Sequence, residues 1–421
     1  MTWLSFIFKS LKNRATTTLL TVVSIALSVM LLVGVEVVQE AAEEGFTQSV
    51  SNTDLIVGAK SGPIQLILYT VFNMGSATNN VSFETWQKYQ QHPAVEWTIP
   101  YSLGDSHRGF RVVGTNADFF KHYQFRGDQK ISFQQGVEFS GIWDVVLGGE
   151  VAESLGYKLG DPIVVAHGVT KGEGIVHHDD KPFKVVGILN KTGTPVDRSL
   201  YVSLKSLEAI HIDWQSGAMP TRETAVPAEQ IREEELQVQS ITAFFLRTKG
   251  RIETLRLQRE INTDSSEALL AIIPAVTLSE LWRSLSYAEK VLRLISWMVV
   301  AVGLVSMLIA LLTSLNERRR EMAILRAIGC RPQQLSLLLI AESFMITVTG
   351  IIAGLFFATA LVFLVRPWMA SEFGFYLEAQ ILNLRVISFL AAMLVAGLFI
   401  GILPGLQARR QSLKDGLSLR L

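Results

Sequence analysis

The sequence predicts a membrane α-helical protein with four transmembrane helices and an α+β domain inserted between the first helix and the other three. Three observations predict this fold. Charged residues make up only 18% of the 421-residue chain, against about a quarter in an ordinary soluble protein. They are missing from four apolar stretches that are each long enough to cross a bilayer. They are close to normal in the roughly 250 residues between the first and second stretches, which is enough chain to bury a core.

The four apolar stretches are Ala15–Val35, Ile295–Leu315, Leu337–Val365 and Val386–Leu406. A helix needs about 20 mostly apolar residues to cross the hydrocarbon core, so each stretch is long enough. Basic residues precede the first stretch, as in a cleaved signal peptide. Its apolar core is longer than the roughly 7–15 residues of such a signal, however, and no clear A-x-A cleavage site follows. We therefore expect an uncleaved anchor.

The positions of Lys and Arg predict the orientation, since these residues accumulate on the cytoplasmic side of bacterial inner-membrane proteins. They cluster before the first stretch, between the second and third, and after the fourth. The clustered residues are Lys9, Lys12, Arg14, Arg318, Arg319, Arg320, Arg326, Arg331, Arg409, Arg410, Lys414 and Arg420. We therefore expect both termini in the cytoplasm, with residues 36–293 and the short loop Arg366–Arg385 outside.

This topology divides the chain into three parts. Residues 1–45 hold the first helix and its outward extension, residues 46–285 form the outer domain, and residues 286–421 hold the last three helices. Within the outer domain, residues 213–239 are polar and rich in turn residues, so we expect an insertion or long loop. The apolar run Ile64–Phe72 is too short to span, and either lies in the core or forms an exposed surface for a partner or lipid-like substrate.

Apolar runs and turn residues predict the elements of the outer domain. Strands are expected at Asp54–Ala59, Phe110–Val113 (ending in a turn at Gly114), Asp144–Leu147, Ile163–Ala166, Lys184–Leu189 and Ser240–Arg247. Helices are expected at Ser82–Gln91, Glu150–Leu155, Ile252–Asn262 and Val276–Ala288. Ser82 is placed to cap the first of these helices.

The segment Glu317–Ile328, directly after the second apolar stretch, predicts a short amphipathic helix on the cytoplasmic surface. It lacks Pro and Gly and is rich in strong helix formers. Gly329 suits the C-terminus of this helix and Pro332 suits the first turn of the next. Its apolar side carries Met322, Leu325 and Ile328, and its basic side carries Arg319, Arg320 and Arg326. By itself, this pattern is also typical of a helix that lies on anionic lipid.

The order of one helix, a large outer domain and three helices resembles the permease subunits of the MacB / LolC-LolE / FtsX family of ABC transporters, the type VII or mechanotransmission class. The resemblance covers nearly the whole chain and includes three runs. These are NERRREMAILRAIGCRPQQL at Asn316–Leu335, LGGEVAESLGYKLGDPIVV at Leu147–Val165 with FKVVGIL at Phe183–Leu189, and IPAVTLSELWRSL at Ile273–Leu285. The outer domain is thus similar to the MacB-like periplasmic core domain.

The resemblance implies a non-catalytic permease subunit that couples ATP hydrolysis to motion of periplasmic domains, for lipoprotein or lipid extraction, efflux or activation of an envelope enzyme. It implies two cytoplasmic ABC ATPase subunits that bind ATP and Mg²⁺, a second permease copy or a paralogue, contact with membrane lipid, and a periplasmic adaptor or lipoprotein. The coupling residues it implies are Glu317, Arg318, Arg319, Arg320, Glu321, Met322, Leu325, Arg326, Ile328 and Gly329. The alternative is a membrane-anchored periplasmic ligand sensor or scaffold that regulates an envelope enzyme.

Several function classes are disfavoured. The chain has no G-x-x-x-x-G-K-[ST] motif; the fragment Gly58–Gly62 lies in the outer domain, where there is no ATP. We therefore expect the ATPase to be a separate chain, since only about 14 residues precede the first helix. The 38 basic and 38 acidic residues balance, so no nucleic-acid partner is expected. No nucleophile–base motif indicates an enzyme.

Three further features carry hypotheses. Imidazole and carboxylate groups in one loop could bind a divalent metal, although consecutive residues rarely all reach one ion, and a solvated polar loop is the alternative. These residues are His167, His177, His178 and Asp179, with Asp180 beside them. Gly350 and Gly354 form a G-x-x-x-G pattern suited to close helix packing. Glu342, near the cytoplasmic end of the third stretch, is expected to snorkel or to pair with Arg326 or Arg319.

Overall fold

The computed structural model describes residues 9, 11–47, 49–167, 178–213, 226–317, 322, 324–325, 327–373 and 381–414. The chain divides into two compact units. A membrane unit contains residues 1–41, 286–368 and 377–421, and an outer domain contains residues 42–285 and 369–376.

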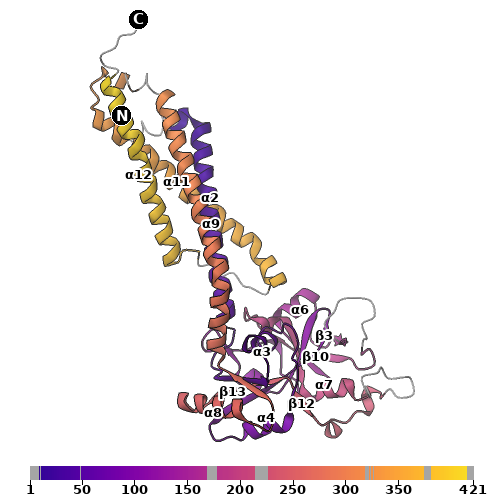
Figure 1. The fold of residues 1–421 in the computed structure, drawn as a ribbon. Helices are drawn as coiled ribbons and strands as arrows, with labels where there is room; N and C mark the ends of the chain where they lie inside the picture. The colour runs from indigo at the N-terminus through magenta and orange to yellow at the C-terminus, as the bar shows by residue number, and fades with distance from the viewer. Residues whose placement is uncertain are drawn as a thin grey trace. The chain divides into compact units, whose positions relative to one another are not determined.

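Most of the residues of four long helices belong to the membrane unit (Figure 1): α2 (Ala15–Thr47), α9 (Pro274–Glu317), α11 (Pro332–Phe373) and α12 (Leu384–Lys414). Each contains a stretch with a mean hydropathy of 2.5 to 2.7, long enough to cross a bilayer. Large apolar side chains such as Leu19 and Phe363 point outward, as expected for helices that face lipid. The prediction of four transmembrane helices is confirmed.

The helices are longer than the apolar stretches that predicted them. Helix α11 continues through Pro367 to Phe373, so the beginning of the predicted loop Arg366–Arg385 is helical. Helix α12 continues past Pro404 to Lys414. A proline removes one backbone hydrogen bond and favours a kink, but membrane helices tolerate it because neighbouring helices, hydroxyl side chains or local changes of the helix satisfy the freed backbone groups. The prediction that Arg366–Arg385 is a loop was therefore wrong for its first eight residues.

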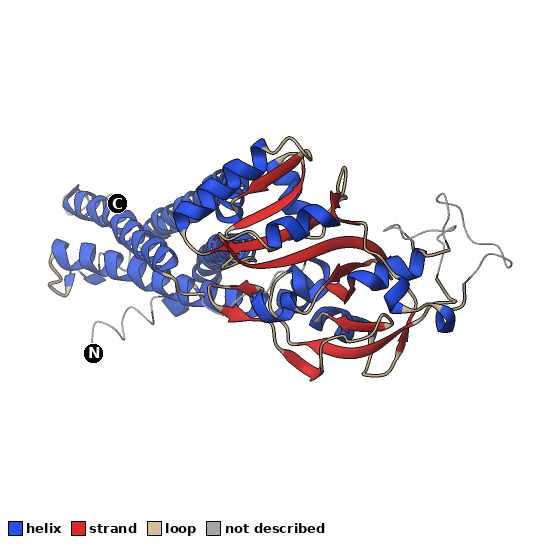
Figure 2. Cartoon of the chain, turned by 90° about the horizontal axis from the view of Figure 1, so that it is seen from below, coloured by secondary structure: helices blue, strands red, loops and turns tan. Residues whose placement is uncertain are grey.

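A ten-stranded mixed sheet organises the outer domain, in the order β14-β1-β13-β3-β4-β11-β8-β10-β7, with β9 on β10. Figure 2 shows the strands in red and the helices in blue. The β4–β11 and β8–β10 pairs are parallel and the others are antiparallel. The strands are β1 Leu55–Ala59, β3 Val95–His107, β4 Phe110–Thr115, β7 Phe133–Gly136, β8 Asp144–Leu147, β9 Pro162–Ile163, β10 Phe183–Leu189, β11 Ser199–Ser203, β13 Ala243–Thr248 and β14 Leu269–Ile272.

Helices cover both faces of this sheet. Along β1, Leu55 and Val57 belong to the same buried cluster as residues of α4 and α8, whereas Ile56 packs with residues of α3 and α5. This alternation is the two-residue period of a strand that is buried on both faces. The helices are α3 Pro63–Thr70, α4 Phe83–Gln90, α5 Asp118–His122, α6 Gly149–Leu155, α7 Leu204–His211 and α8 Arg251–Thr263, with 3-10 turns η1 Pro195–Arg198, η3 Ala228–Gln230 and η4 Glu233–Glu235. Two small antiparallel pairs are β2 Val81–Ser82 with β12 Ser240–Ile241, and β5 Gln124–Phe125 with β6 Gln129–Lys130.

Most predicted elements of the outer domain are present with small shifts at their ends. Ser82 caps α4 as predicted, since its side chain accepts a hydrogen bond from Thr85 N. Three predictions were wrong. Of the predicted strand Ile163–Ala166, only Ile163 lies in a strand, β9, and Ala166 forms an isolated bridge with Ser106. Gly114 lies inside β4 rather than in a turn, because it pairs with both neighbouring strands. The predicted strand Ser240–Arg247 is divided at Thr242, whose hydroxyl accepts a hydrogen bond from Leu103 N at 3.0 Å.

The apolar run beginning at Ile64 forms helix α3, in which Leu66, Ile67 and Tyr69 are buried in the domain core. This burial excludes the alternative of a large exposed surface there. In the polar stretch 213–239, residues 214–225 lie outside the described part of the chain. Ile231 and Leu236 from the remainder are buried against Ala209 of α7, so this part is anchored to the domain.

Candidate functional site

Small residues bring the first, second and third membrane helices into close contact. A Cβ atom at Gly350 would lie 2.5 Å from Ile25 Cγ2, and one at Gly354 would lie 2.5 Å from Val29 Cβ. Both glycines therefore face α2, and the contact leaves no room for a side chain. Ser28 of α2 donates a hydrogen bond to Val299 O of α9 at 3.2 Å. Association through small and hydroxyl residues is typical of helices in lipid.

Helix α12 packs on α11 through a similar pattern that was not predicted. Ser343 Oγ donates to Gly397 O at 2.6 Å and Ser336 Oγ donates to Gly405 O at 2.8 Å. Gly397, Gly401 and Gly405 recur every four residues on one face of α12. The repeated four-residue spacing was a visible signal in the sequence, because it places the glycines in one line along a helix.

A buried carboxylate joins α2, α9 and α12 in the membrane unit. Glu36 of α2 is 3% exposed, with one oxygen 3.6 Å from Arg293 Nη2 and the other 3.5 Å from Arg385 Nη1. Asn383, just before α12, caps that helix through Val386 N at 2.7 Å and donates to Glu40 at 2.6 Å. Two arginines thus neutralise one buried acidic group at the meeting point of three helices.

The predicted coupling segment lies between α9 and α11. Of its residues, Arg318, Arg319, Arg320, Glu321 and Arg326 lie outside the described part of the chain. Met322 packs beside Leu312 and Leu339. Ile324 and Ile328 are 53% and 78% exposed, and Ile328 N donates to Ile324 O at 3.1 Å, as in a helical turn. Gly329 has a φ of +100°, the left-handed conformation that ends a helix.

The predicted apolar side of the segment does not face a single direction in the structure. Met322 faces the neighbouring helices, whereas Ile328 faces outward together with Ile324. Residues four apart lie on one face of a helix, so the outward apolar surface of the segment contains Ile324 and Ile328. Pro332 begins α11, as the sequence predicted.

Glu342 of α11 is 3% exposed, which excludes the snorkelling alternative and leaves pairing with Arg326 or Arg319 as a prediction. It lines a cavity of about 30 Å³ together with Arg14, Thr21 and Met307. Arg326 and Arg319, its predicted partners, lie outside the described residues. Arg14 lines the same cavity, and a cation near a buried carboxylate lowers the cost of its burial.

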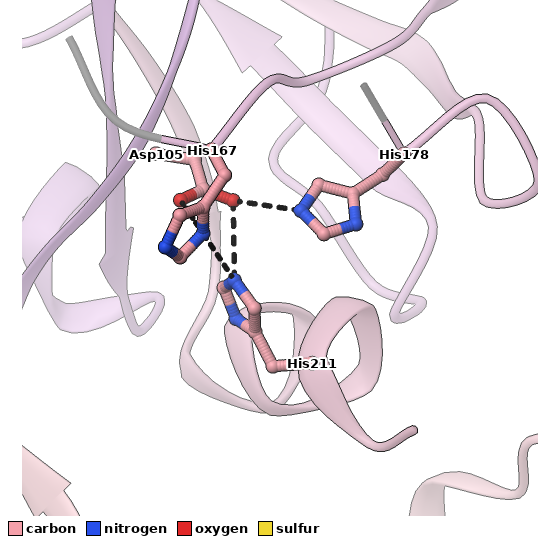
Figure 3. Close-up of side chains that lie close together, drawn as sticks. All are labelled: Asp105, His167, His178 and His211. Atoms are coloured by element: carbon pink, nitrogen blue, oxygen red, sulfur yellow. Dashed lines mark hydrogen bonds and ion pairs between the residues drawn. The ribbon is translucent and has the colours of Figure 1, made fainter. Parts of the chain in front are cut away.

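In the outer domain, four metal-ligating side chains converge from three separate parts of the chain (Figure 3). Asp105 lies near the end of β3, His167 and His178 flank the segment after β9, and His211 is the last residue of α7. Asp105 and His178 are 4% and 2% exposed, whereas the side chain of His167 is 51% exposed. One atom from each residue lies within 4.8 Å of the others.

Backbone pairing explains why these residues meet. Ser106 and Ala166 exchange two backbone hydrogen bonds at 3.0 and 2.8 Å, which places Asp105 beside His167. The register between β3 and β4 shifts between Leu103 and Ser106. Such an irregularity redirects a side chain, and Asp105, Ser106 and His107 are all buried, contrary to the alternation of a regular strand.

Electrostatics couples the carboxylate to the imidazoles. Burial by itself would raise the pKa of Asp105, but the adjoining His178 and His211 hold that pKa well below its usual range. Burial would lower the pKa of His211, but the hydrogen bond and charge of Asp105 outweigh it, and the net result is a raised pKa. The cluster therefore keeps Asp105 ionised, which is the form that binds cations.

The sequence predicted only part of this cluster. His167 and His178 are members, Asp179 is not, and His177 lies outside the described residues. The expectation that consecutive residues do not all reach one site agrees with this arrangement. Asp105 and His211 were missed. No spacing rule connects them to His167, because they meet only through the sheet and α7.

Together, the four apolar helices and the mixed α/β domain define a multi-pass membrane protein with a large domain between its first and second membrane helices. The model of the FtsX-like permease C-terminal family matches residues 293–413, and that of the MacB-like periplasmic core domain matches residues 18–244. The chain belongs to the MacB/FtsX-type family of ABC transporter permeases, and its outer domain is the periplasmic core domain.

Among proteins with a curated name, the macrolide export ATP-binding/permease protein MacB of Campylobacter jejuni is 24% identical over 229 residues. That match covers 53% of this chain and 33% of the relative, so the chain matches about a third of the relative's length. Among solved structures, the extracellular domain of the noncanonic ABC-type transporter YknZ from Gram-positive bacteria is 12% identical, with a TM-score of 0.31. This comparison covers 52% of this chain and all of the other.

Proposed function

We propose that this chain is the permease subunit of an ABC transporter that converts ATP hydrolysis in a separate cytoplasmic ATPase into motion of its periplasmic domain. One observation carries the proposal. Helix α9 is continuous from Pro274 to Glu317. Leu278, near its start, is buried in the periplasmic core cluster, and the helix ends at the coupling segment. At 1.5 Å per residue it is about 66 Å long, roughly twice the thickness of the hydrocarbon core.

The contacts within the membrane unit support transmission along this helix. Helix α9 is tied to α2 through Ser28 and through Glu36–Arg293. The same carboxylate contacts Arg385 of α12. Because packed helices with paired buried charges move together more readily than they deform, a push at the coupling segment reaches α2, α9 and α12 as a group.

The proposed partners follow from this role. Two ATPase subunits would bind ATP and Mg²⁺ and dock on the coupling segment, and a second copy of this chain or a paralogue would complete the membrane unit. Ile324 and Ile328 are outward-facing apolar residues suited to a groove on the ATPase, with the neighbouring arginines placed for acidic groups or lipid headgroups. The proposed location is the bacterial inner membrane, with both termini in the cytoplasm. The substrate is a lipoprotein, a lipid or the cargo of a periplasmic efflux assembly.

The test is reconstitution of the permease with its cognate ATPase in lipid nanodiscs. Leu325→Asp and Ile328→Asp are each expected to lower permease-dependent ATPase stimulation at least about 10-fold, since a charge in an apolar docking groove costs more than about 1.4 kcal/mol. Glu321→Lys should also lower the stimulation, because it reverses a charge in the proposed coupling segment. Ile252→Asp is the matched control, because Ile252 is an isoleucine of similar exposure (69%) on α8 of the periplasmic domain. Full stimulation in the coupling variants, with intact binding of the ATPase, would contradict the proposal.

A further inference from the structure

We propose that Asp105, His167, His178 and His211 form a Zn²⁺ site in the periplasmic domain. No described feature of the permease mechanism uses these residues. They belong to one compact unit of the chain. Their convergence therefore defines a second function of the domain, the binding of a transition-metal ion, which is independent of the proposed coupling to an ATPase.

The spacing of the ligand atoms fits a tetrahedral ion. With zinc–nitrogen and zinc–oxygen bonds of 2.0–2.1 Å, neighbouring ligand atoms of a tetrahedron lie about 3.3 Å apart. His167 Nδ1 lies 3.2 Å from His211 Nε2 and 3.3 Å from Asp105 Oδ1. Asp105 Oδ2 lies 3.3 Å from His178 Nε2 and 3.4 Å from His211 Nε2. With Asp105 Oδ2 as the carboxylate ligand, three edges of the four-atom set match the tetrahedral value to within about 0.1 Å, and all four ligand atoms lie within 4.8 Å of one another.

A hydrogen bond outside the cluster prepares one of the ligands. His211 Nδ1 lies 2.9 Å from Leu207 O, a contact in which the ring nitrogen must donate its proton. In the neutral ring, the lone pair is then on Nε2, which points at the cluster (Figure 3). A second hydrogen bond that orients a ligating imidazole in this way is typical of metal sites and strengthens the ligand.

A buried ion pair holds two of the ligand-bearing segments together. Lys181 lies three residues after His178 and Asp213 two residues after His211. Lys181 Nζ lies 2.7 and 2.8 Å from the two oxygens of Asp213, and both side chains are 0% exposed. Lys181 N also donates to His178 O at 3.1 Å. This pair positions His178 and His211 without contributing a ligand.

The donor set selects the class of metal. Three imidazoles and one carboxylate suit Zn²⁺, whereas Ca²⁺ and Mg²⁺ prefer oxygen ligands alone. A tetrahedral arrangement also favours Zn²⁺ over Cu²⁺, which prefers a square-planar site. Four protein ligands leave no open position for a substrate, so the site is structural or sensory rather than catalytic. The half-exposed His167 gives the ion a route from solvent.

The experiment uses the full-length protein in detergent, purified through a tag without histidines and stripped with a chelator. After equilibrium dialysis against buffered free Zn²⁺, mass spectrometry of the metal content should show about one zinc per chain. His178→Ala, His211→Ala and Asp105→Asn should each weaken zinc binding by on the order of 100-fold or more, beyond the effect of losing an outer hydrogen bond. Co²⁺ bound in place of zinc should show the strong visible absorption of tetrahedral coordination.

Controls separate loss of a ligand from loss of fold. His167→Ala removes the most exposed ligand and should lower affinity while metal-free thermal unfolding stays as in the wild type. His122→Ala and Asp179→Asn alter a histidine elsewhere in the domain and a carboxylate next to the site, and both should keep one zinc. Zinc binding that is unchanged in folded ligand variants, or absent from the wild type at micromolar free Zn²⁺, would overturn the proposal. ATPase coupling could fail its own test without affecting this one.

Discussion

Replacement of Lys181 by methionine tests how strongly the buried Lys181–Asp213 pair stabilises the periplasmic domain. Methionine fills a similar volume but cannot pair with the carboxylate of Asp213, which is 0% exposed. That carboxylate still accepts a hydrogen bond from Val226 N at 3.1 Å. Loss of one partner of a buried ion pair costs about 3–5 kcal/mol. For a domain of this size, each kcal/mol lowers the Tm by about 2–4 °C, so the expected decrease is about 6–20 °C.

The assay is thermal unfolding in detergent, followed by tryptophan fluorescence with a chelator present so that zinc has no effect. Lys205→Met is the matched control, since Lys205 pairs with Glu233 at 3.3 Å while both side chains are substantially exposed. An exposed pair contributes about 0–1 kcal/mol, so its Tm should change by less than about 4 °C. The double variant Lys181→Met, Asp213→Leu should regain most of the loss, because apolar residues replace the whole pair.

The pH dependence of this stabilisation follows from the ionisation of the Asp213 carboxylate. Burial by itself would raise the pKa of Asp213, but its hydrogen bond and charge interaction with Lys181 hold that pKa below the ordinary value of 3.8. The pair therefore stabilises the domain fully above pH 3.8 and loses this contribution as the pH falls through the lower pKa of the folded state. Without Lys181, burial leaves the pKa of Asp213 above its ordinary value. The Tm difference between wild type and Lys181→Met should therefore be largest at neutral pH and should shrink as the pH falls through that raised pKa. A variant that unfolds within about 2 °C of the wild type at neutral pH would refute the reasoning.

Three further substitutions test contacts of other kinds. Gly354→Leu should destabilise the membrane unit by about 1–3 kcal/mol through overpacking against Val29. Gly34→Leu is the control and should leave the Tm in detergent unchanged, because no atom lies within 4 Å of the added Cβ. Equal effects of the two substitutions would contradict this packing. Glu36→Gln removes the charge that two arginines contact and should lower the Tm by an amount equivalent to about 1–3 kcal/mol, while Glu36→Asp should recover part of it. Ser82→Ala removes the cap of α4 and should cost about 1 kcal/mol in chemical unfolding; no change would show that the cap is dispensable.

Elements with a strong local signal could be predicted from the sequence. The four membrane helices follow from long apolar stretches, and β8 and β10 follow from short apolar runs bounded by turn residues. The cap of α4 follows from Ser82. Each signal lies within one segment, so no knowledge of distant contacts is needed. Predictions were wrong where a neighbouring segment decides, as at Gly114, which is held in a strand by partners on both sides.

The candidate metal site shows the same division. The sequence indicated His167 and His178 because a concentration of imidazole and carboxylate groups is visible along the chain. It could not indicate Asp105, whose side chain is directed inward at a register shift in β3, or His211, which the end of α7 brings to the same place. Asp179 was a candidate through proximity in sequence alone and does not belong to the cluster.

The sequence by itself determined the class of protein, the number of membrane helices and the segment proposed to couple to an ATPase, because hydrophobic length, basic residues and family motifs are properties of local sequence. Only the tertiary structure decided which residues meet. It placed Glu36 between two arginines and Met322 inward while Ile328 faces outward, and it brought four possible ligand atoms within 4.8 Å of one another. These contacts depend on strand register and helix packing between segments far apart in the chain. They cannot be predicted from the sequence of one segment alone.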